Sequence, residues 1–237
     1  MYPLAAGMIN QLNRVDTISN NLANANTNGY KQTGLTEGTF NNYLDKAVEQ
    51  NKPTSKLNVV MNNVPKLDAR FINSEMGPMV QTANALDFAL KQPDTFFKVQ
   101  APNGEIHLTR DGSFKVVNDQ LVNANNYPVL DGENEPIQVE EGVNIAAVLG
   151  IAQTTYDNLE NVGKNGFRVK ENALVNYNAV EDPLTAAEQG VLEKSNVNSV
   201  TAMVQLIDAH RRFEQAQKAI TGIGEMNSKM MDKLTAN

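Results

Sequence analysis

The chain has 237 residues, of which 41% are hydrophobic, so it can bury a sizeable core. Its 27 acidic residues outnumber its 20 basic residues, and a net charge of −7 argues against a protein that tracks nucleic-acid phosphates. Cysteine is absent, which excludes disulfides, thiolate nucleophiles and Cys-ligated metals. No segment resembles a cleaved signal peptide or has the roughly 20 apolar residues of a membrane-spanning helix.

A seven-residue hydrophobic repeat covers the first 25 residues. One line of the repeat holds Met1, Met8, Val15 and Leu22, and the other holds Leu4, Gln11, Ile18 and Ala25. The opposite face is polar, and it carries Asn10, Asn13, Arg14, Thr17 and Asn21. The Asn-rich and Gly-containing run that follows Leu22 favours a turn. We therefore expect an amphipathic coiled-coil helix within residues 1–30.

The same repeat returns at the other end, over residues 195–237, and continues for five heptads. Its two lines hold Ala202, Leu206, Ala209, Phe213, Ala216, Ile220, Ile223, Asn227, Met230 and Leu234. Gly222 and Gly224 each cost about 1 kcal/mol relative to Ala, which favours a kink or fraying near Ile223. Asn227 either fixes the register of this helix or lies in its frayed end. The methionines at 226, 230 and 231 are typical of adaptable core.

Between the two ends, the repeat gives way to short β segments divided by turn residues. Four consecutive segments predict a β-meander: Phe96–Gln100, Glu105–Thr109, Ser113–Val117 and Leu121–Asn123. Further strands are expected at Leu57–Met61, Ala69–Ile72, Pro128–Leu130, Pro136–Val139, Val143–Ile151 and Phe167–Val169. Polar residues 31–56 and 181–194 read as connectors. The predicted fold is α+β, with a discontinuous coiled-coil stalk from both termini and an antiparallel β-rich domain over residues 57–180.

Two terminal heptad stripes must bury their apolar lines, and each can supply the partner of the other. Several apolar residues lie off the two lines and widen the apolar face: Leu12, Val197, Val200, Met203, Val204 and Ile207. Such residues need a third surface, which neighbouring copies can supply, and head-to-tail contacts that do not close into a ring build a helical tube. The alternative is a monomeric α+β fold in which both helices pack onto the β domain.

Other function classes have weaker support in the sequence. The acidic run Asp131, Glu133, Glu135, Glu140 and Glu141 offers Ca²⁺ ligands or paired carboxylates, but it lacks EF-hand spacing and fits a solvated loop better. A carbohydrate-binding β module needs an aromatic platform, yet only 6% of residues are aromatic and none is Trp. We therefore expect no enzymatic activity, no cofactor, no metal and no small-molecule substrate.

Three separated runs resemble one known family. The N-terminal run, Asn20–Lys31 (NNLANANTNGYK), resembles the N-terminal signature of the flagellar rod, hook and hook-associated axial proteins. The C-terminal run, Leu192–Asn198 (LEKSNVN), together with Arg211–Glu214 (RRFE), resembles their C-terminal signature. The β run, Leu108–Phe114 (LTRDGSF), is similar to the β domain of the rod and hook members. The short middle leaves no room for the outer domains of a hook protein, and the length and RRFE run resemble the proximal-rod F type more than the distal-rod G type.

This resemblance implies a structural subunit of the bacterial flagellar basal-body rod. It implies a coiled-coil inner layer with a β domain outside it, helical stacking around an export channel, and transmission of torque. The implied partners are copies of the chain itself, other proximal and distal rod proteins, and the flagellar type III export apparatus, with no nucleic acid. The implied location is the rod in the periplasm, reached without signal cleavage.

The heptads and the resemblance together predict an assembly interface. Asn21 and Asn24 either hydrogen-bond across a subunit seam or cap a helix end, and Gly29 supplies a positive φ. Arg211 and Arg212 either pair with Asp208 or Glu214 on neighbouring copies or lie on a solvated face. The expected interface residues are Leu4, Met8, Val15, Ile18, Asn21, Leu22, Asn24, Gly29, Tyr30, Asn196, Val197, Leu206, Arg211, Phe213, Ile220, Ile223 and Leu234.

Overall fold

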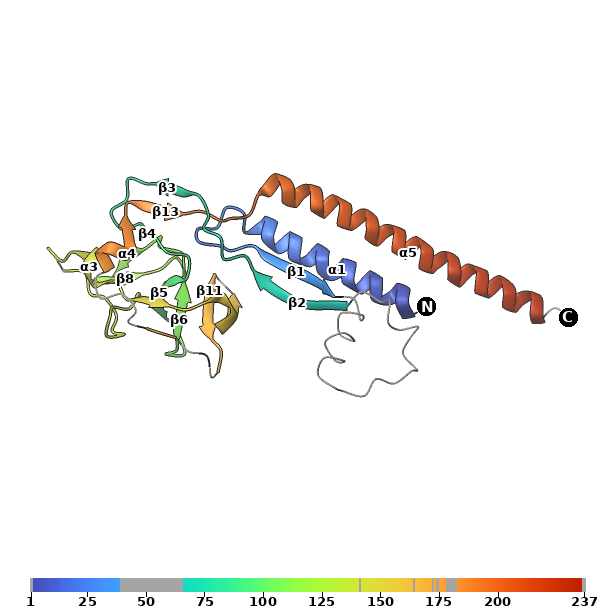
Figure 1. The fold of residues 1–237 in the computed structure, drawn as a ribbon, viewed down its shortest axis with the longest axis horizontal. Helices are drawn as coiled ribbons and strands as arrows, with labels where there is room; N and C mark the ends of the chain where they lie inside the picture. The colour runs from blue at the N-terminus through green and yellow to red at the C-terminus, as the bar shows by residue number, and fades with distance from the viewer. Residues whose placement is uncertain are drawn as a thin grey trace, which may run out of the picture. The chain divides into compact units, whose positions relative to one another are not determined.

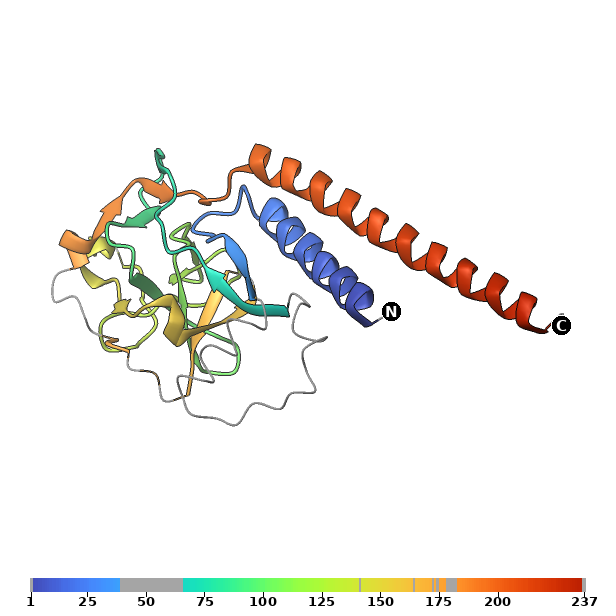
Figure 2. The ribbon, with the colours of Figure 1, turned by 45° about the vertical axis from the view of Figure 1, so that its right-hand side comes forward.

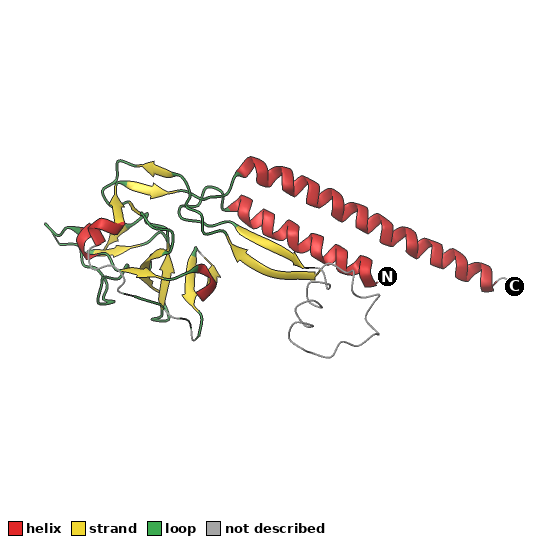
Figure 3. Ribbon diagram, in the orientation of Figure 1, coloured by secondary structure: helices red, strands yellow, loops and turns green. Residues whose placement is uncertain are grey.

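The computed structural model describes residues 2–38, 66–140, 142–163, 165–171, 173, 175–177 and 183–235. The chain forms two compact units, each made of separate segments. The helical unit comprises Met1–Ala23, Thr33–Phe71 and Asn198–Asn237, and the β unit comprises Asn24–Gln32 and Ile72–Val197. Terminal helices and antiparallel strands confirm the predicted α+β class (Figure 3). No helix of the described residues has the length and apolar character needed to cross a membrane.

The helical unit is built on two helices that lie side by side, α1 (Tyr2–Ala23) and α5 (Ser199–Thr235) (Figures 1 and 2). The positions of α5 that become buried or half-buried are those of the predicted heptad lines: Ala202, Leu206, Ala209, Phe213, Ala216 and Ile220. The helix continues through Gly222 and Gly224 to Thr235, so the expected fraying near Ile223 does not occur. The predicted pairing of the terminal helices is confirmed.

Three residues of the polar face of α1, Asn10, Thr17 and Asn21, are buried, whereas Arg14 on the same face is exposed. A two-stranded sheet, β1 (Thr33–Gly38) and β2 (Lys66–Ile72), belongs to the same unit, and β1 contacts α1. The Asn21 side chain donates to the Thr33 carbonyl at 2.8 Å and accepts from the Thr33 amide at 2.9 Å. The Asn21 amide carries both a donor and an acceptor, so it bonds the backbone N–H and C=O of Thr33 in the way that a neighbouring strand would. Residues 33–38, expected in a connector, form a strand that pairs with β2, and Asn21 holds the first residue of that strand.

The β unit contains a five-stranded antiparallel sheet in the order β10-β11-β6-β5-β9. Its strands are β10 (Leu159–Gly163), β11 (Gly166–Val169), β6 (Ile106–Thr109), β5 (Thr95–Gln100) and β9 (Ile151–Gln153). Smaller ribbons pair β12 (Ala187–Gln189) with β4 (Phe88–Leu90), β13 (Val191–Glu193) with β3 (Met79–Gln81), and β7 (Lys115–Val117) with β8 (Gln120–Val122). The short helices α3 (Ile145–Val148) and α4 (Pro183–Ala186) and the 3₁₀ turn η2 (Tyr156–Asn158) complete the unit.

The four central strands occur where expected, but they do not form a meander. β5 pairs with β6, whereas β6 then pairs with β11, and β7 and β8 form a separate hairpin. The chain leaves the sheet after Thr109 because Gly112 closes against the backbone of Phe88, whose amide donates to the Gly112 carbonyl at 3.0 Å. The expected strand Val143–Ile151 is also wrong, since Asn144 caps α3 by accepting from the Ala146 amide. The strand expected at Leu57–Met61 lies outside the described residues.

Two clusters of buried side chains lie on opposite faces of β5. Phe97 faces the larger cluster, where its ring meets Phe114 edge-on with centroids 5.1 Å apart. Phe96 faces the smaller cluster and meets Tyr156 edge-on, also at 5.1 Å. Both residues have 0% exposure, and adjacent residues of a strand point to opposite faces. Packing on both faces makes this sheet the core of the β unit.

The close approach of Gly112 to the Phe88 backbone predicts that adding a methyl group at residue 112 destabilises the fold. A Cβ at this position would overlap the Phe88 carbonyl oxygen, whereas a Cβ at Gly132 would meet nothing within 4 Å. Gly112→Ala should lower the free energy of unfolding by about 1–3 kcal/mol or more. Gly132→Ala should change it by less than about 1 kcal/mol. Urea unfolding followed by far-UV circular dichroism measures both, and equal effects of the two substitutions would contradict this packing.

Candidate assembly interface

The expected interface residues on the two helices mostly serve the α1–α5 pair of the same chain. Ile18 is buried, and six others are half-buried: Met8, Val15, Leu22, Leu206, Phe213 and Ile220. Ile223 is 37% exposed, and Asn21 is bonded to Thr33 as described above. Leu4 and Leu234 lie in the helices, but their side chains are outside the described part. The two heptad lines therefore form a seam within the chain.

A second set of apolar residues on the helices faces solvent. Val200, Met203, Val204 and Ile207 of α5 are between 52% and 70% exposed. Their spacing of three and four residues places them on one face, away from Ala202 and Ala209. On α1, Ile9 and Leu12 are 56% and 48% exposed. Contiguous exposed apolar side chains mark an interaction surface.

The arginines of α5 lie on its solvent side. Arg212 Nε donates to Asp208 Oδ2 at 2.8 Å, one helical turn away, and both side chains are 58% exposed. An exposed pair of this kind contributes about 0–1 kcal/mol. Arg211, expected to pair with an acid on a neighbouring copy, is exposed. Its proposed pairing with a neighbour stays a prediction.

The three runs that carry the family resemblance meet inside the β unit at one carboxylate. Glu193 of the C-terminal run accepts from Lys31 Nζ of the N-terminal run at 2.6 Å. Its other oxygen accepts from Nε of Arg110 of the β run at 2.7 Å and forms an ion pair with Nη2 of the same guanidinium, also at 2.7 Å. The side chains of all three residues are at most 1% exposed. We call Lys31, Arg110 and Glu193 the charge triad.

Backbone groups satisfy the remaining polar atoms around the charge triad. The Gly77 amide donates to Glu193 Oε1 at 2.9 Å, and Lys31 Nζ donates to the Glu75 carbonyl at 2.6 Å. The guanidinium of Arg110 also donates to the carbonyls of Leu90, Gln92, Pro93 and Thr95 at 2.8–3.3 Å. Burial lowers the pKa of the Lys31 ammonium, while its hydrogen bond to Glu193 opposes that shift. Such dense hydrogen bonding is what allows charges to be buried.

The neighbouring residues of the N-terminal run shape the chain around the charge triad. Gly29 has a φ of 65°, which confirms the expected positive φ, and its amide donates to the Glu193 carbonyl at 2.7 Å. A Cβ at this position would overlap the backbone of Arg110 and Asp111. Asn24 Oδ1 accepts from Thr27 Oγ1 at 3.2 Å, as in a local turn, and Tyr30 is half-buried. These residues therefore hold the β unit together.

The C-terminal run is fixed in the same way. Asn196 Oδ1 accepts from the Gln32 amide at 2.7 Å, and its Nδ2 donates to the carbonyls of Asn73 and Glu75 at 3.1 and 3.0 Å. Val197 is buried, with 8% exposure. Sequence reasoning placed Asn196 and Val197 at an interface and overlooked the charge triad. The sequence did offer one sign of the triad, because Lys31, Arg110 and Glu193 each lie in one of the three runs that resemble the family.

The acidic loop offered as a calcium site already holds a cation of the protein. The Lys98 ammonium, which is fully buried, donates to the Gly132 carbonyl at 3.2 Å and to Asn134 Oδ1 at 2.7 Å. Asp131 Oδ1 accepts the amides of Glu133 and Glu135 and so closes its own turn. Among the described residues no group of three His, Asp or Glu side chains gathers as a metal site, and Glu141 lies outside them. The oxygen atoms of this loop serve folding.

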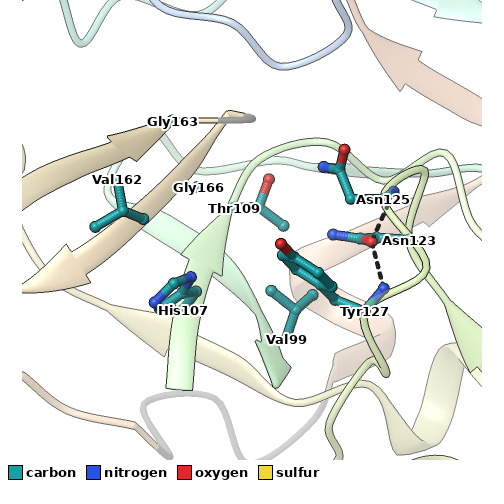
Figure 4. A pocket seen from close by; sticks show the side chains of 9 residues that line it. All are labelled: Val99, His107, Thr109, Asn123, Asn125, Tyr127, Val162, Gly163 and Gly166. Carbon is teal, nitrogen blue, oxygen red and sulfur yellow. Dashed lines mark hydrogen bonds between the residues drawn. The ribbon is translucent and has the colours of Figure 1, made fainter. Parts of the chain in front are cut away.

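Two hollows on the described part of the β unit lack the character of a substrate site. One hollow of about 40 Å³ lies between Val99, His107, Thr109 and Tyr127 (Figure 4), which is space for a few water molecules. Its polar groups are already used, since Asn123 Oδ1 accepts the amides of Asn125 and Tyr127, both at 2.9 Å. An open depression of about 480 Å³ beside Pro102 and Pro128 is lined by amide, apolar and tyrosyl groups. Neither presents a pair of acid and base groups.

Family models match three regions of the chain. Residues 1–31 match "Flagella basal body rod protein", residues 92–155 match "Flagellar hook protein FlgE/F/G D1 domain", and residues 188–233 match "Flagellar basal body rod FlgEFG protein C-terminal". These regions contain Lys31, Arg110 and Glu193 respectively. The charge triad therefore joins the three regions of the chain that the family models match.

Individual relatives support the same assignment. The chain is 33% identical to flagellar basal-body rod protein FlgF of Rhizobium meliloti, over 85% of the chain and 83% of that protein. It is 31% identical to FlgF of Mesorhizobium japonicum, over 85% and 83%, and 31% identical to FlgG of Borreliella burgdorferi, over 93% and 92%. The chain thus belongs to the FlgE/F/G family of flagellar basal-body rod and hook proteins. Members of this family are structural, and the chain is not an enzyme.

The charge triad predicts that a single substitution at Glu193 greatly lowers the free energy of unfolding. Glu193→Gln keeps the size of the side chain but leaves two buried cations without an anion, which should cost about 3–5 kcal/mol of folding free energy. Glu188→Gln, at an exposed position of β12, should change stability by less than about 0.5 kcal/mol. Urea unfolding of the β signal compares the two variants. A Glu193→Gln protein as stable as the Glu188→Gln control would show that the triad is not a stabilising requirement.

The burial of Asp111, next to Arg110, predicts that the stability of the fold depends on pH. Burial raises the pKa of its carboxyl above 3.8, although the hydrogen bonds from Ser113 oppose the shift. The folded state therefore keeps this proton to higher pH than the unfolded state, so the group reduces stability as pH rises above 3.8. Asp111→Asn keeps the oxygen acceptor without the charge.

We expect Asp111→Asn to be more stable than the parent protein at neutral pH, with the difference shrinking as the pH falls towards 3.8. Denaturation midpoints across this pH range provide the measurement. Asp157→Asn, at an exposed residue, serves as the control and should show no such pH-dependent gain. A variant that is less stable than the parent at neutral pH would contradict the predicted direction.

Proposed function

We propose that this chain is a FlgF-type subunit that assembles helically, with copies of itself and with other proximal and distal rod proteins, around a central channel. The observation that carries this proposal is the exposed apolar surface on both members of the helix pair. Within the described residues the inner seam is already filled, so Ile9, Leu12 and the stripe from Val200 to Ile207 remain available to neighbours. An exposed apolar surface on a folded helix pair favours further helix packing.

The proposal also covers where the subunit lies in the cell and the torque that it transmits. FlgF and FlgG relatives are named as basal-body rod proteins, and we propose the same periplasm-spanning place for this chain. We further propose that it leaves the cell through the flagellar type III apparatus without signal cleavage, and that it transmits torque. In this scheme residues 1–30 and 195–237 supply the coiled-coil elements. Residues 57–180 supply most of the β-rich domain, and β12 and β13 of the expected connector 181–194 complete it.

Charged substitutions in the seam test assembly. Leu22→Asp and Ile220→Asp place a carboxylate in the half-buried line between α1 and α5, and burying an unpaired charge disrupts packing. We expect both variants to lose sedimentable assemblies and to abolish swimming in cells that rely on them. Gln215→Asp, at an exposed position of the same helix, is the matched control and should retain both properties.

The β unit should stay folded in both seam variants, because its core and charge triad do not include these residues. Far-UV circular dichroism of the soluble protein checks this point. Normal assembly and swimming of the Leu22→Asp and Ile220→Asp variants would contradict the proposal that the helix pair carries assembly.

A further inference from the structure

The ribbon of β3 and β13 leaves one edge of β3 open. Within the described residues β3 pairs with β13 and with no other strand, so it is an edge strand (Figure 1). All three residues of β3 are exposed, whereas the three residues of β13 are buried. Met79 and Val80 are each 41% exposed, and they lie on opposite faces of the ribbon because side chains alternate along a strand. Both faces of β3, as well as its edge, are therefore accessible.

Hydrogen bonds on either side of β3 show which backbone groups face β13. The Lys194 amide donates to the Pro78 carbonyl at 2.9 Å, and the Thr82 amide donates to the Gly190 carbonyl at 2.6 Å. Bonded residues alternate along an antiparallel pair, so residues 78, 80 and 82 turn their backbone hydrogen-bonding groups toward β13. The N–H and C=O groups of residues 79 and 81 point the other way, to the open edge.

This edge lacks the features that protect two other outer strands of the β unit. Charged side chains and irregular pairing discourage the addition of another chain. β7 carries Lys115, and β10 carries Glu160, which pairs with Arg168 at 2.8 Å beside a shift in the register of β10 and β11. Residues 76–86 contain no charged side chain, although the chain has a net charge of −7. An uncharged edge with apolar side chains favours the addition of a strand.

The open edge of β3 is complementary to itself. When two copies of β3 run antiparallel with Val80 opposite Val80, Met79 of each copy lies opposite Gln81 of the other. The outward backbone groups then form four hydrogen bonds, two for each pair of Met79 and Gln81. The two Val80 side chains meet on one face as β-branched neighbours. Glu75, the charged residue nearest to Val80 in the sequence, falls opposite uncharged Ala85, so like charges do not oppose the pairing.

We propose that β3 docks against β3 of a second copy of this chain, and that the two ribbons form a four-stranded antiparallel sheet about a two-fold axis at Val80. The contact uses the same surface on both copies, so it closes on itself and does not extend into a tube. It is therefore separate from the proposed helical assembly, which uses the helix pair. Two three-residue strands bury little area, so the dimer is weak and reversible.

A symmetric disulfide tests the register directly, because the chain has no cysteine. Opposite residues in a non-hydrogen-bonded antiparallel pair have Cα atoms about 4.5 Å apart, a distance that a disulfide spans. Full-length Val80→Cys under mild oxidation should form disulfide-linked dimers at least about tenfold faster than Val116→Cys. Val116 is the matched control, since it is a valine of the edge strand β7 with 39% exposure. Non-reducing gel electrophoresis measures both rates.

Paired charges at residue 80 provide a second arm without a thiol. Val80→Lys and Val80→Glu each place two like charges across the two-fold axis, so each variant alone should dimerise at least about fivefold more weakly than the parent. An equimolar mixture places Lys opposite Glu and should restore association at low salt, which also shows that both variants are folded. Val116→Lys should dimerise as the parent does. Sedimentation equilibrium at high protein concentration measures the dimer.

The Leu22→Asp background separates this inference from the proposed function. That substitution is expected to disrupt assembly through the helix pair, yet it should leave the Val80→Cys disulfide unchanged. Loss of the disulfide in this background would overturn the docking edge, because the contact would then depend on the helices. Equal rates at residues 80 and 116, or a Val80→Lys protein that dimerises as well as the parent, would also overturn it and leave helical assembly intact. A chain that forms the β3 dimer but never builds sedimentable assemblies would support the docking edge and overturn the proposed function alone.

Discussion

The fold of the β unit depends on a single buried carboxylate held between two cations. Glu193 bridges Lys31 and Arg110, which lie 162 and 83 residues away along the chain. Removing three charges from water is costly, and only the full set of hydrogen bonds offsets that cost. The arrangement therefore works as an all-or-none condition: each partner is tolerated in the interior only when the other two are present. Its main effect is to specify which distant segments meet.

That condition explains why the family resemblance is concentrated in three short runs. Gly29 must lack a side chain because the backbone of Arg110 occupies the space, and Gly77 must approach Glu193 closely enough to donate its amide. Asn196 ties both neighbouring segments with three hydrogen bonds. The residues that look like an assembly signature in the sequence are thus in large part the residues that close the β unit. Assembly is left to the apolar faces of the helices.

The sequence predicted the terminal helices and most central strands because their periodicity is local. It did not predict the pairing of β6 with β11, since that choice depends on Gly112 closing against Phe88 and on Arg110 turning inward. The burial of Asn21 was also missed, because a polar residue opposite an apolar stripe reads as solvated until a strand is known to lie beside it. The charge triad was missed for the same reason: one lysine, one arginine and one glutamate show no relation until the chain brings them together.

The interleaving of the two units has a mechanical consequence. The backbone passes from one unit to the other after residues 23, 32, 71 and 197. A domain inserted in one place would be attached by two crossings, and an appended domain by one. Here a pull on either unit is divided among four backbone connections, so tension on any single connection is reduced.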